Sequence, residues 1–515
     1  MYLTQGLHRA VQQHPDAVAT ICGDRSRTFA EVAVRVSRLA GALRELGVRD
    51  GDRVAMLALN SDRYHEYLLA VPWANAVVNP VNVRWSPAEI AFSLRDSGSR
   101  VLFVDDAFAG MVPALRAEYP ELATVVHAGE GDAPEGMVPY EELVAGSAPI
   151  EDARRGGDEL AGLFYTGGTT GSPKGVMLSH ANLMVSCLGL AASGYLATGE
   201  MRFLHAAPMF HLADLAFWNV TTAKGGCHVI VPAFKPADVL AAIAGHAVTD
   251  VLLVPLMIQM LVDHPDVGDY DLTTLGSVVY GASPIPQAVL ERAMTVLPGA
   301  SFVQAYGMTE LSPVATLLGP GDHRKPGLLR AAGRAAPHAE VRVVDVDGDE
   351  VPPGTVGEVV VRGGHVMLGY WNRPAETAAA LRDGWMHTGD GGYLDDDGYL
   401  FVVDRIKDMI VTGGENVYSA EVENALVTHP AVASCAVIGV PDSDWGERVH
   451  AVVVLGEGQR VTAEELREYA KTRIAGYKAP RTVEFVDVLP VSGAGKILKR
   501  KLREPYWAGA DRQIR

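Results

Sequence analysis

Tyr165-Thr166-Gly167-Gly168-Thr169-Thr170-Gly171-Ser172-Pro173-Lys174-Gly175 is the most informative stretch of the sequence. Its glycines let backbone N–H groups approach a polyanion without obstruction by a Cβ atom. The threonines and the serine add hydroxyl donors, and Lys174 adds a positive charge. An ordinary surface turn rarely combines so many hydroxyls with a lysine, so we predict a phosphate-binding loop. It is not a Walker loop, because Gly175 stands where such a loop has serine or threonine.

Around this loop the chain alternates strand-like and helical patterns. The apolar pair Leu163-Phe164 predicts a strand that leads into the loop. Strands that alternate with helices predict an α/β fold with parallel sheets and helices on both faces. Ligands in such sheets bind at the carboxyl ends of the strands. Similar apolar runs recur at residues 54–57, 101–104, 229–231, 251–254, 278–280 and 302–304.

The pattern changes after about Gly333. Short β runs, separated by turns such as Asp347-Gly348, predict a small β unit that closes the large domain. Further along, strand-like runs flank helices, and one helix opens with a capping box of Thr462 and Glu465. We therefore expect a large N-terminal α/β domain at residues 1–405 and a small α+β C-terminal domain at residues 406–515.

The length and composition restrict the class of protein. A chain of 515 residues exceeds what one hydrophobic core usually serves, which agrees with two domains. Its hydrophobic and charged fractions, 48% and 21%, are those of a globular protein. The net charge of -18 argues against non-specific nucleic-acid binding, which needs a basic surface. The four cysteines lack the spacing of a metal site or a disulfide framework.

The start of the sequence does not have the pattern of a signal peptide. Residues 1–5 lack the basic and apolar regions of a signal peptide. No apolar run is long enough to cross a bilayer. We therefore expect a cytoplasmic protein without a transmembrane segment.

Residues 165–175 resemble the signature loop of the adenylate-forming superfamily. This superfamily includes acyl-CoA synthetases, aryl-CoA ligases, luciferases and the adenylation domains of peptide synthetases. Several motifs in the family's order extend the resemblance over nearly the whole chain. Gly167 stands where the family usually has serine, which removes one hydroxyl but keeps the backbone donors. The resemblance implies that the ATP phosphates are held by Thr166, Gly167, Gly168, Thr169, Thr170, Gly171, Ser172 and Lys174.

Residues 208–211 resemble the family's motif that lines the acyl pocket. The resemblance implies that His211 orients the substrate carboxylate. Asp214 is discordant in an apolar pocket, since it must either face solvent or meet a polar group on the acid. The expected pocket wall consists of His211, Asp214, Trp218, Met257, Tyr280 and Gly281.

Residues 304–310 resemble the family's block at the adenine, the α-phosphate and the metal. The resemblance implies that Tyr306 stacks on adenine, that Thr309 contacts the α-phosphate and that Glu310 helps to hold Mg²⁺. Oxygen ligands suit this hard cation, and Thr170 is the second expected metal contact. The adenine site is expected to include Gly281, Ala282, Ser283, Gln304 and Gly307.

Motifs towards the C-terminus resemble the family's ribose, hinge and catalytic-lysine segments. They imply that Asp390 and Arg405 contact the ribose, because a carboxylate can accept two hydrogen bonds at once. Lys407 matches the hinge position, and Lys496 matches the catalytic lysine. The loop expected over the active site during thioester formation contains Gly413, Gly414 and Glu415.

The resemblance implies a reaction in two steps. The carboxylate of the acid attacks the α-phosphorus of ATP and pyrophosphate leaves, while Lys496 bridges the two anions. The small domain then rotates about Lys407, and the thiol of coenzyme A attacks the acyl-adenylate and releases AMP. The expected small-molecule partners are therefore a carboxylic acid, ATP and coenzyme A, with Mg²⁺.

Other functions stay open at this point. An adenylating enzyme could use a carrier-protein thiol or an amine as acceptor, or act on an unusual oxyacid. A scaffold protein without activity is disfavoured, because the chain keeps Lys496, Glu310, Asp390 and Arg405. The sequence does not specify the acid, and it leaves a homodimer open.

Overall fold

The computed structural model describes residues 1–166, 173–197, 199–283, 285–405, 408–412, 415–442, 444–491 and 497–508. The chain divides into two compact units. The first consists of Met1–Leu329, Gly333–Val341 and Val361–Met386. The second consists of Arg330–Ala332, Arg342–Val360 and His387–Arg515. The predicted boundary between residues 405 and 406 separates a fixed part of the chain from a moving one, and it stays a prediction.

A nine-stranded sheet in the first unit has the order β16-β15-β14-β13-β12-β10-β11-β1-β2. Its inner strands, from β14 to β1, run parallel, and antiparallel strands flank them. The predicted parallel α/β sheet is thereby confirmed. Its strands are β1 (Val18–Cys22), β2 (Arg25–Thr28), β10 (Arg202–His205), β11 (Cys227–Ile230), β12 (Asp250–Leu253), β13 (Ser277–Gly281), β14 (Ser301–Tyr306), β15 (Thr316–Leu318) and β16 (Arg334–Ala335).

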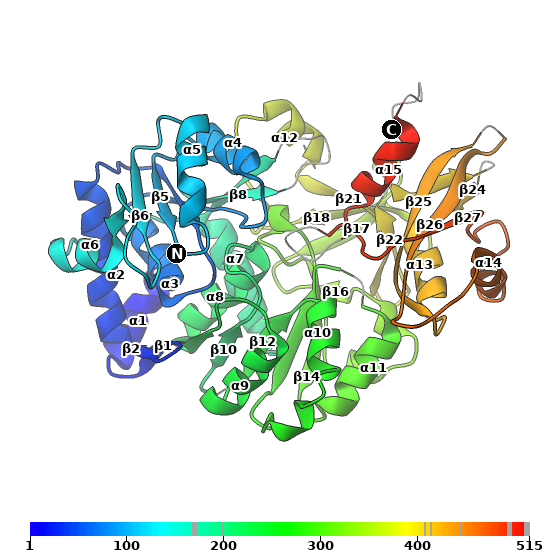
Figure 1. Ribbon diagram of the computed structural model, residues 1–515, viewed down its shortest axis with the longest axis horizontal. Helices are drawn as coiled ribbons and strands as arrows, with labels where there is room; N and C mark the ends of the chain where they lie inside the picture. The colour runs from blue at the N-terminus through cyan, green and yellow to red at the C-terminus, as the bar shows by residue number, and fades with distance from the viewer. Residues whose placement is uncertain are drawn as a thin grey trace. The chain divides into compact units, whose positions relative to one another are not determined.

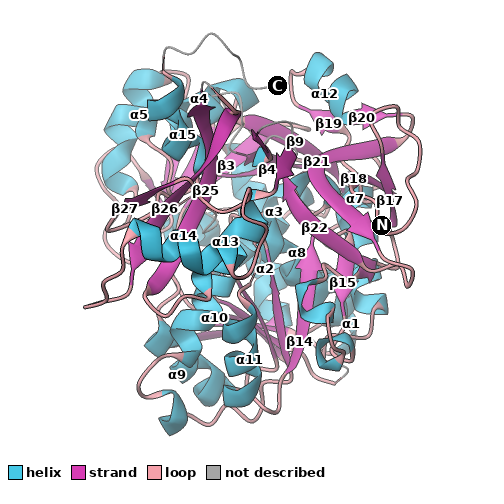
Figure 2. Cartoon of the chain, turned by 90° about the vertical axis from the view of Figure 1, so that its right-hand side faces the viewer, coloured by secondary structure: helices cyan, strands magenta, loops and turns pink. Residues whose placement is uncertain are grey.

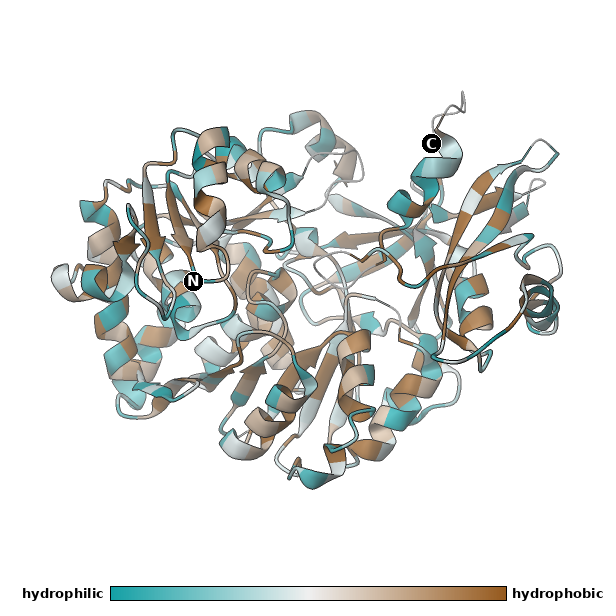
Figure 3. Ribbon diagram, in the orientation of Figure 1, coloured by the Kyte–Doolittle hydropathy of each residue, from teal (hydrophilic) through white to brown (hydrophobic). Residues whose placement is uncertain are grey.

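Helices cover this sheet because their apolar stripes pack against its buried strands. In α9, Val239, Leu240 and Ile243 recur at helical spacing and share one core cluster with Val251 of β12. Figure 1 shows α9, α10 and α11 next to one another along the sheet, and Figure 3 shows its inner strands as mostly hydrophobic. The helices are α8 (Leu212–Lys224), α9 (Pro236–His246), α10 (Pro255–Val262) and α11 (Gln287–Val296).

An eight-stranded sheet in the same unit has the order β19-β9-β8-β4-β3-β5-β6-β7. The strands from β8 to β7 pair in parallel, whereas β9 pairs antiparallel with β8 and with β19. Its strands are β3 (Arg53–Leu57), β4 (Val77–Pro80), β5 (Val101–Val104), β6 (Thr124–His127), β7 (Val138–Pro139), β8 (Leu160–Thr166), β9 (Lys174–Ser179) and β19 (Gly369–Tyr370). The helices around it are α1 (Gln5–Gln13), α2 (Phe29–Glu45), α3 (Asp62–Trp73), α4 (Pro87–Ser97), α5 (Val112–Glu118), α6 (Tyr140–Gly146) and α7 (His180–Ala192).

Helix α3 is buried along its whole length, although it carries charged residues. Asp62 accepts a hydrogen bond of 2.8 Å from Arg25, and Arg27 also bonds to it. Glu66 accepts a hydrogen bond of 2.6 Å from the hydroxyl of Tyr140. A buried charge is tolerated only when it is paired and hydrogen-bonded, and these carboxylates meet that condition.

A five-stranded sheet comes next along the chain, in the order β17-β18-β21-β20, with β22 paired to β21. It is the small β unit that the sequence predicts after Gly333. Its strands and its helix are β17 (Glu340–Val344), β18 (Gly357–Arg362), α12 (Pro374–Ala380), β20 (Leu381–Arg382), β21 (Trp385–Leu394) and β22 (Leu400–Arg405).

The C-terminal part of the second unit is the predicted α+β structure. Figure 2 shows α13 and α14 lying beside the sheet of β25, β26 and β27. Thr462 and Glu465 form the predicted capping box at the start of α14. Among the described residues, no helix is long and apolar enough to cross a membrane. The elements are β23 (Ile410–Thr412), β24 (Glu415–Val417), α13 (Ser419–Val427), β25 (Val432–Asp442), β26 (Gly446–Leu455), α14 (Ala463–Lys471), β27 (Thr482–Phe485) and α15 (Lys499–Trp507).

Candidate active site

Parallel strands bring the predicted nucleotide and acid motifs to one edge of the nine-stranded sheet. β13 ends at Gly281 and β14 ends at Tyr306, and their register places Gly281 opposite Ala305. His211 follows the carboxyl end of β10, which belongs to the same parallel set. Because the carboxyl ends of parallel strands share an edge, motifs that are far apart in the sequence become neighbours here.

The predicted glycines of this edge are fixed by close backbone contacts. A Cβ atom on Gly281 would lie 2.2 Å from the carbonyl oxygen of Ala305. A Cβ atom on Gly307 would lie 2.0 Å from the carbonyl oxygen of Pro313. Ala282, which follows Gly281, has a left-handed φ of 66°. Packing of the chain against itself therefore explains these glycines, and their adenine-binding role stays a prediction.

Three other predicted site residues on this edge are half-buried, namely Ser283, Gln304 and Thr309. The amide oxygen of Gln304 is buried, and no described residue donates a hydrogen bond to it. A buried polar atom without a partner costs free energy, so this oxygen is suited to a ligand that donates a hydrogen bond. The observation fits a purine amino group, although the role of Gln304 stays a prediction.

The predicted phosphate loop closes a β-hairpin. β8 and β9 pair antiparallel, with Thr166 opposite Lys174. The hydroxyl of Tyr165 donates to Asp96 of α4 at 2.7 Å, which fixes the base of the hairpin. The strand predicted before the loop is confirmed. The loop residues Gly167, Gly168, Thr169, Thr170, Gly171 and Ser172 lie outside the described residues, so their roles rest on the sequence.

Tyr370 links the predicted metal glutamate to the lysine of the hairpin. Its hydroxyl donates a hydrogen bond of 2.8 Å to Oε1 of Glu310. The Nζ atom of Lys174 lies 5.3 Å from the centre of the Tyr370 ring, within the range of a cation–π contact. β19 brings the tyrosine here by pairing with β9. Tyr370 was not predicted from the sequence, since it lies 60 residues from Glu310 and no local pattern marks it.

Asn60 forms hydrogen bonds with the backbone of the segment that leads to His211. The amide nitrogen of Asn60 donates to the carbonyl oxygens of His205 and Ala207 at 3.2 and 2.9 Å. Its amide oxygen accepts a hydrogen bond of 2.7 Å from the backbone N–H of Met209. Asn60 was not predicted from the sequence either, since it lies 149 residues before Met209.

His211 is the N-cap residue of α8 and is half-buried. Its Nδ1 atom accepts from the backbone N–H of Ala213 at 3.3 Å. A neutral imidazole that accepts at Nδ1 carries its proton on Nε2, where it can donate to a carboxylate. The geometry is therefore compatible with the predicted role of His211, which stays a prediction.

Two residues expected in the pocket wall have partners within the core. Asp214 is only 1% exposed, and its Oδ2 atom lies 2.7 Å from Nδ1 of His205. The suggestion that Asp214 faces solvent is therefore wrong. The indole N–H of Trp218, also fully buried, donates to Nδ1 of His65 at 2.9 Å. Both residues lie on the face of α8 that packs against polar groups of the core.

The two predicted ribose contacts lie opposite each other in the second unit. β21 and β22 pair antiparallel, and the register places Asp390 across from Arg405. Asp390 is 7% exposed, and its backbone N–H donates to the hydroxyl of Thr388 at 3.1 Å. The fold thus places the backbone positions of this predicted pair opposite each other, and their contact with the ribose stays a prediction.

The remaining predictions for the second unit concern its loops. Glu415 is exposed and begins β24, where it pairs with Thr412 of β23. Four residues lie outside the described ones, so their roles rest on the sequence: Lys407, Gly413, Gly414 and Lys496.

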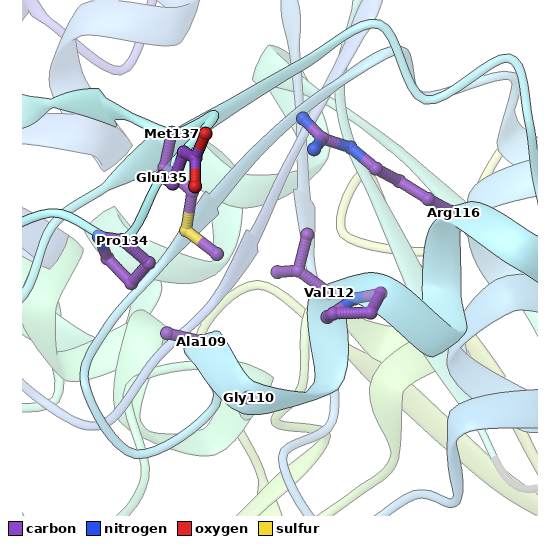
Figure 4. Close-up of a pocket in the computed structure, with 8 residues that line it drawn as sticks. Ala109, Gly110, Val112, Arg116, Pro134, Glu135 and Met137 are labelled. Carbon is purple, nitrogen blue, oxygen red and sulfur yellow. The ribbon is translucent and has the colours of Figure 1, made fainter.

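A surface pocket of about 480 Å³ lies between the start of α5 and the segment before β7 (Figure 4). Its lining is mostly apolar, with Arg116 and Glu135 as the charged members. None of the residues predicted for catalysis or nucleotide binding lines it, so this pocket is separate from the candidate site. Its lining residues are Ala109, Gly110, Val112, Pro113, Arg116, Pro134, Glu135 and Met137.

Two family models match the chain. The AMP-binding enzyme model matches residues 7–371, and the AMP-binding enzyme C-terminal domain model matches residues 421–496. The chain belongs to the AMP-binding enzyme family. The resemblance to the adenylate-forming superfamily is thereby confirmed.

Relatives of this AMP-binding enzyme match it over almost its whole length. A feruloyl-CoA synthase from an Amycolatopsis species is 43% identical over 97% of this chain and 98% of the relative. The fatty acid–[acyl-carrier-protein] ligase ScoC of Streptomyces coeruleorubidus is 38% identical over 98% of this chain and 96% of the relative. The solved structure of o-succinylbenzoate CoA synthetase from Bacillus subtilis, with a bound acyl-adenylate, matches with a TM-score of 0.86. It is 32% identical over 99% of this chain and 98% of that one.

These matches confirm the expected class of enzyme. This AMP-binding enzyme is an adenylate-forming acid–thiol ligase of the acyl-CoA synthetase type. The expected α/β fold, with a large N-terminal part and a small C-terminal part, is also that of its structural neighbours.

Proposed function

We propose that this ligase activates a hydroxycinnamic acid of the ferulate type and transfers the acyl group to coenzyme A. The observation that supports this acid is the identity of 43% with a feruloyl-CoA synthase over nearly the full chain. The adenine and acid motifs lie at the carboxyl edge of one parallel sheet, and this arrangement supports the reaction, since the acid must meet the α-phosphate of the nucleotide there.

The chemistry of the first step asks mainly for positioning and charge neutralisation, because both reactants are anions. Lys174 and the hairpin loop would hold the β- and γ-phosphates. His211 would donate from Nε2 to the carboxylate of the acid, and Lys496 would bridge that carboxylate to the α-phosphate. In the second step the thiol attacks the acyl carbon, the C–O bond to AMP breaks, and AMP leaves with the electron pair.

The surroundings of Glu310 are suited to Mg²⁺. Its carboxylate is a hard oxygen donor that is 6% exposed, and Tyr370 orients one of its oxygens. Within the described ranges, no three Asp, Glu, His or Cys side chains form a cage for a metal. Mg²⁺ typically takes one or two protein carboxylates and completes its shell with water and phosphate oxygens. When bound, the ion would neutralise phosphate charge, with Glu310 and Thr170 as its protein ligands.

Tyr370→Phe is expected to weaken MgATP binding. The variant keeps the ring under Lys174 but removes the hydroxyl that donates to Glu310. A hydrogen bond to a charged group contributes about 1.5–3 kcal/mol, so the dissociation constant for MgATP should rise roughly ten- to hundredfold. Calorimetric titration with MgATP measures this directly, and a series of Mg²⁺ concentrations separates the metal effect from the nucleotide effect.

The matched control for this variant is Tyr140→Phe. Tyr140 donates to Glu66 at 2.6 Å in the same unit, so its loss removes an equivalent tyrosine–carboxylate bond away from the site. We expect this control to lower the melting temperature without changing the Mg²⁺ dependence of ATP binding. If both variants bind MgATP as the wild type does, Tyr370 has no part in the metal site.

The proposed substrate class is tested by pyrophosphate release with a panel of acids, each with and without coenzyme A. Ferulate should give pyrophosphate in both cases and a CoA thioester only when CoA is present. A saturated fatty acid with a kcat/KM more than about tenfold above that of ferulate would shift the substrate class to fatty acids. Pyrophosphate release without any CoA thioester would favour a different acceptor.

A second acceptor has specific support. The relative ScoC is named as a ligase that charges an acyl-carrier protein, at 38% identity. A carrier-protein thiol is therefore the alternative to coenzyme A in the same assay. We further propose that the enzyme is cytoplasmic, that residues 406–515 move about Lys407 between the two steps, and that the chain can form a homodimer.

A further inference from the structure

Buried polar side chains form a hydrogen-bonded network between α8, the helix that begins after His211, and strands β10 and β11. Asp214 and Thr222 come from α8, His205 from β10 and His228 from β11. All four are at most 3% exposed. Asp214 Oδ2 lies 2.7 Å from His205 Nδ1, His205 Nε2 lies 2.9 Å from His228 Nδ1, and His228 Nε2 lies 3.1 Å from the Thr222 hydroxyl.

The contact between Thr222 and His228 sets the direction of all the hydrogen bonds in this network. The hydroxyl of Thr222 donates its only proton to the carbonyl oxygen of Trp218 at 2.9 Å. It must therefore accept from Nε2–H of His228. Burial holds the pKa of His228 well below its usual range, so this ring is neutral and its Nδ1 atom is bare. That atom accepts from Nε2–H of His205.

The contact between His205 Nδ1 and Asp214 Oδ2 then requires a proton between the two atoms. A neutral His205 with its proton on Nε2 presents a bare Nδ1 atom to Asp214 Oδ2, and two bare lone pairs at 2.7 Å repel. Burial, opposed in part by His205, raises the pKa of Asp214. The second oxygen, Oδ1, has no hydrogen-bond partner among the described residues. An unpaired oxygen costs less on a neutral carboxylic acid than on a buried carboxylate.

The titratable side chains of α3 that face this network do not supply a positive charge. Tyr64, which interacts electrostatically with Asp214, is fully buried, and burial raises its pKa well above the usual value. His65 lies with its ring 4.5 Å from that of His228, and burial, with the nearby His205, lowers its pKa to about 3. Both side chains are therefore neutral near pH 7, which leaves Asp214 with no cation from this helix.

The hydrogen-bonded network is connected to His211 through the backbone of α8. The N–H of Asp214 donates to the carbonyl oxygen of His211 at 3.0 Å, within the first turn. The side chain of Asp214 ties the same turn to β10 through His205. Loss of the side-chain link would remove one anchor of this turn to the sheet, while Asn60 would still hold the segment before His211.

We propose that Asp214 is a positioning residue: as a neutral acid it donates its proton to His205 and so fixes the first turn of α8, which holds His211 against the carboxylate of the substrate. The inference rests on the proposed role of His211. Asp214 would support that role through the backbone of α8, without contact with the substrate.

The protonation state is tested by infrared difference spectroscopy on the wild type and Asp214→Asn. The wild type should show the C=O stretch of a protonated carboxylic acid near neutral pH, and this band should be missing in the variant. The band should persist in the control Asp250→Asn, since Asp250 is an equally buried carboxyl bonded to Thr249 and Ala197. Absence of the band from the wild type would overturn the proposal.

The dependence of stability on pH gives a second test with a defined sign. The pKa of Asp214 is raised in the folded protein, so its proton stabilises the fold below the ordinary aspartate pKa of about 3.9, and this contribution is lost as pH rises through the folded value. The melting temperature of the wild type, relative to Asp214→Asn, should therefore fall as pH rises. If the melting temperature of the wild type, relative to Asp214→Asn, rises with pH, Asp214 is ionised in the folded protein.

The positioning role is tested by comparing a conservative and a disruptive substitution. The amide of Asp214→Asn can donate to His205 Nδ1 in place of the acid, so its KM for the acid should stay near that of the wild type. Asp214→Leu removes the donor, and its KM for the acid should rise roughly ten- to hundredfold, as for one buried polar partner lost. The KM for ATP should not change in either variant.

A double variant separates this proposal from the role of His211. If Asp214 acts through His211, adding Asp214→Leu to His211→Ala should change the KM for the acid no further. Fully additive effects would overturn the proposal. If His211→Ala alone has no effect on acid binding, the proposed role of His211 fails instead, while the infrared result still decides the protonation of Asp214.

Discussion

Lys496→Ala should lower the rate of acyl-AMP formation by roughly 10²–10³-fold, as expected for the loss of one preorganised charge. Lys496 would neutralise the two anions that meet in the first step, and alanine cannot replace that charge. The second step starts from an acyl-adenylate that is already formed, so it should proceed when this intermediate is supplied. Pyrophosphate exchange measures the first step, and CoA consumption with synthetic acyl-adenylate measures the second.

The matched control is Lys501→Ala, which removes an exposed lysine from the same basic segment. Both steps should survive this change, because a solvated lysine contributes little to a distant reaction. An enzyme that forms acyl-AMP normally without Lys496 would refute the central catalytic assignment. Equal loss of both steps would indicate a structural role for the lysine.

Asp62→Ala should reduce the free energy of unfolding by roughly 3–5 kcal/mol, the usual cost of removing one partner from a buried ion pair. The Asp62 side chain is 1% exposed and binds both Arg25 and Arg27. Alanine would remove the buried carboxylate that the two guanidinium groups share, and would leave Arg25 with the exposed Glu130 and Arg27 with Glu66 at 3.7 Å. Chemical denaturation, followed by circular dichroism, measures the change.

The control for this variant is Asp263→Ala. Asp263 pairs with Arg292 at 2.8 Å, but both side chains are more than 40% exposed. A surface ion pair typically contributes only about 0–1 kcal/mol, so the control should stay close to the wild type. A similar loss in the two variants would mean that the burial of Asp62 is unimportant.

The same carboxylate gives a defined acid sensitivity. Burial alone would raise the pKa of Asp62, but the hydrogen bond from Arg25 and the charges of Arg25 and Arg27 lower it to about 2. Its contribution to stability is complete above the ordinary aspartate pKa of about 3.9 and is lost as pH falls through about 2. The difference in the free energy of unfolding between the wild type and Asp62→Ala should therefore become smaller as the pH is lowered below 4.

Local sequence patterns determined much of the architecture. The alternation of apolar strand runs and helical stretches specified parallel sheets, because each pattern has its own period and its own buried face. The capping box of Thr462 and Glu465 marked the start of α14 correctly, since it involves residues only three positions apart. The strand before the glycine-rich loop was likewise predictable from its apolar residues.

Motif order in the sequence also determined the family and the candidate residues. The structure places several of them together, as with Gly281 beside Ala305 and Asp390 across from Arg405. It describes neither most of the phosphate loop nor Lys496, so for these the assignment comes from the sequence.

Only the tertiary structure decided which residues support the site. Tyr370 meets Glu310 across 60 residues, and Asn60 meets Met209 across 149 residues. Asp214 looked like a discordant member of an apolar pocket, yet it is a buried partner of His205. No local pattern encodes such contacts, because they depend on which strands become neighbours. The sequence thus specified the elements and the reacting groups, whereas the packing of distant strands and helices decided what holds those groups in place.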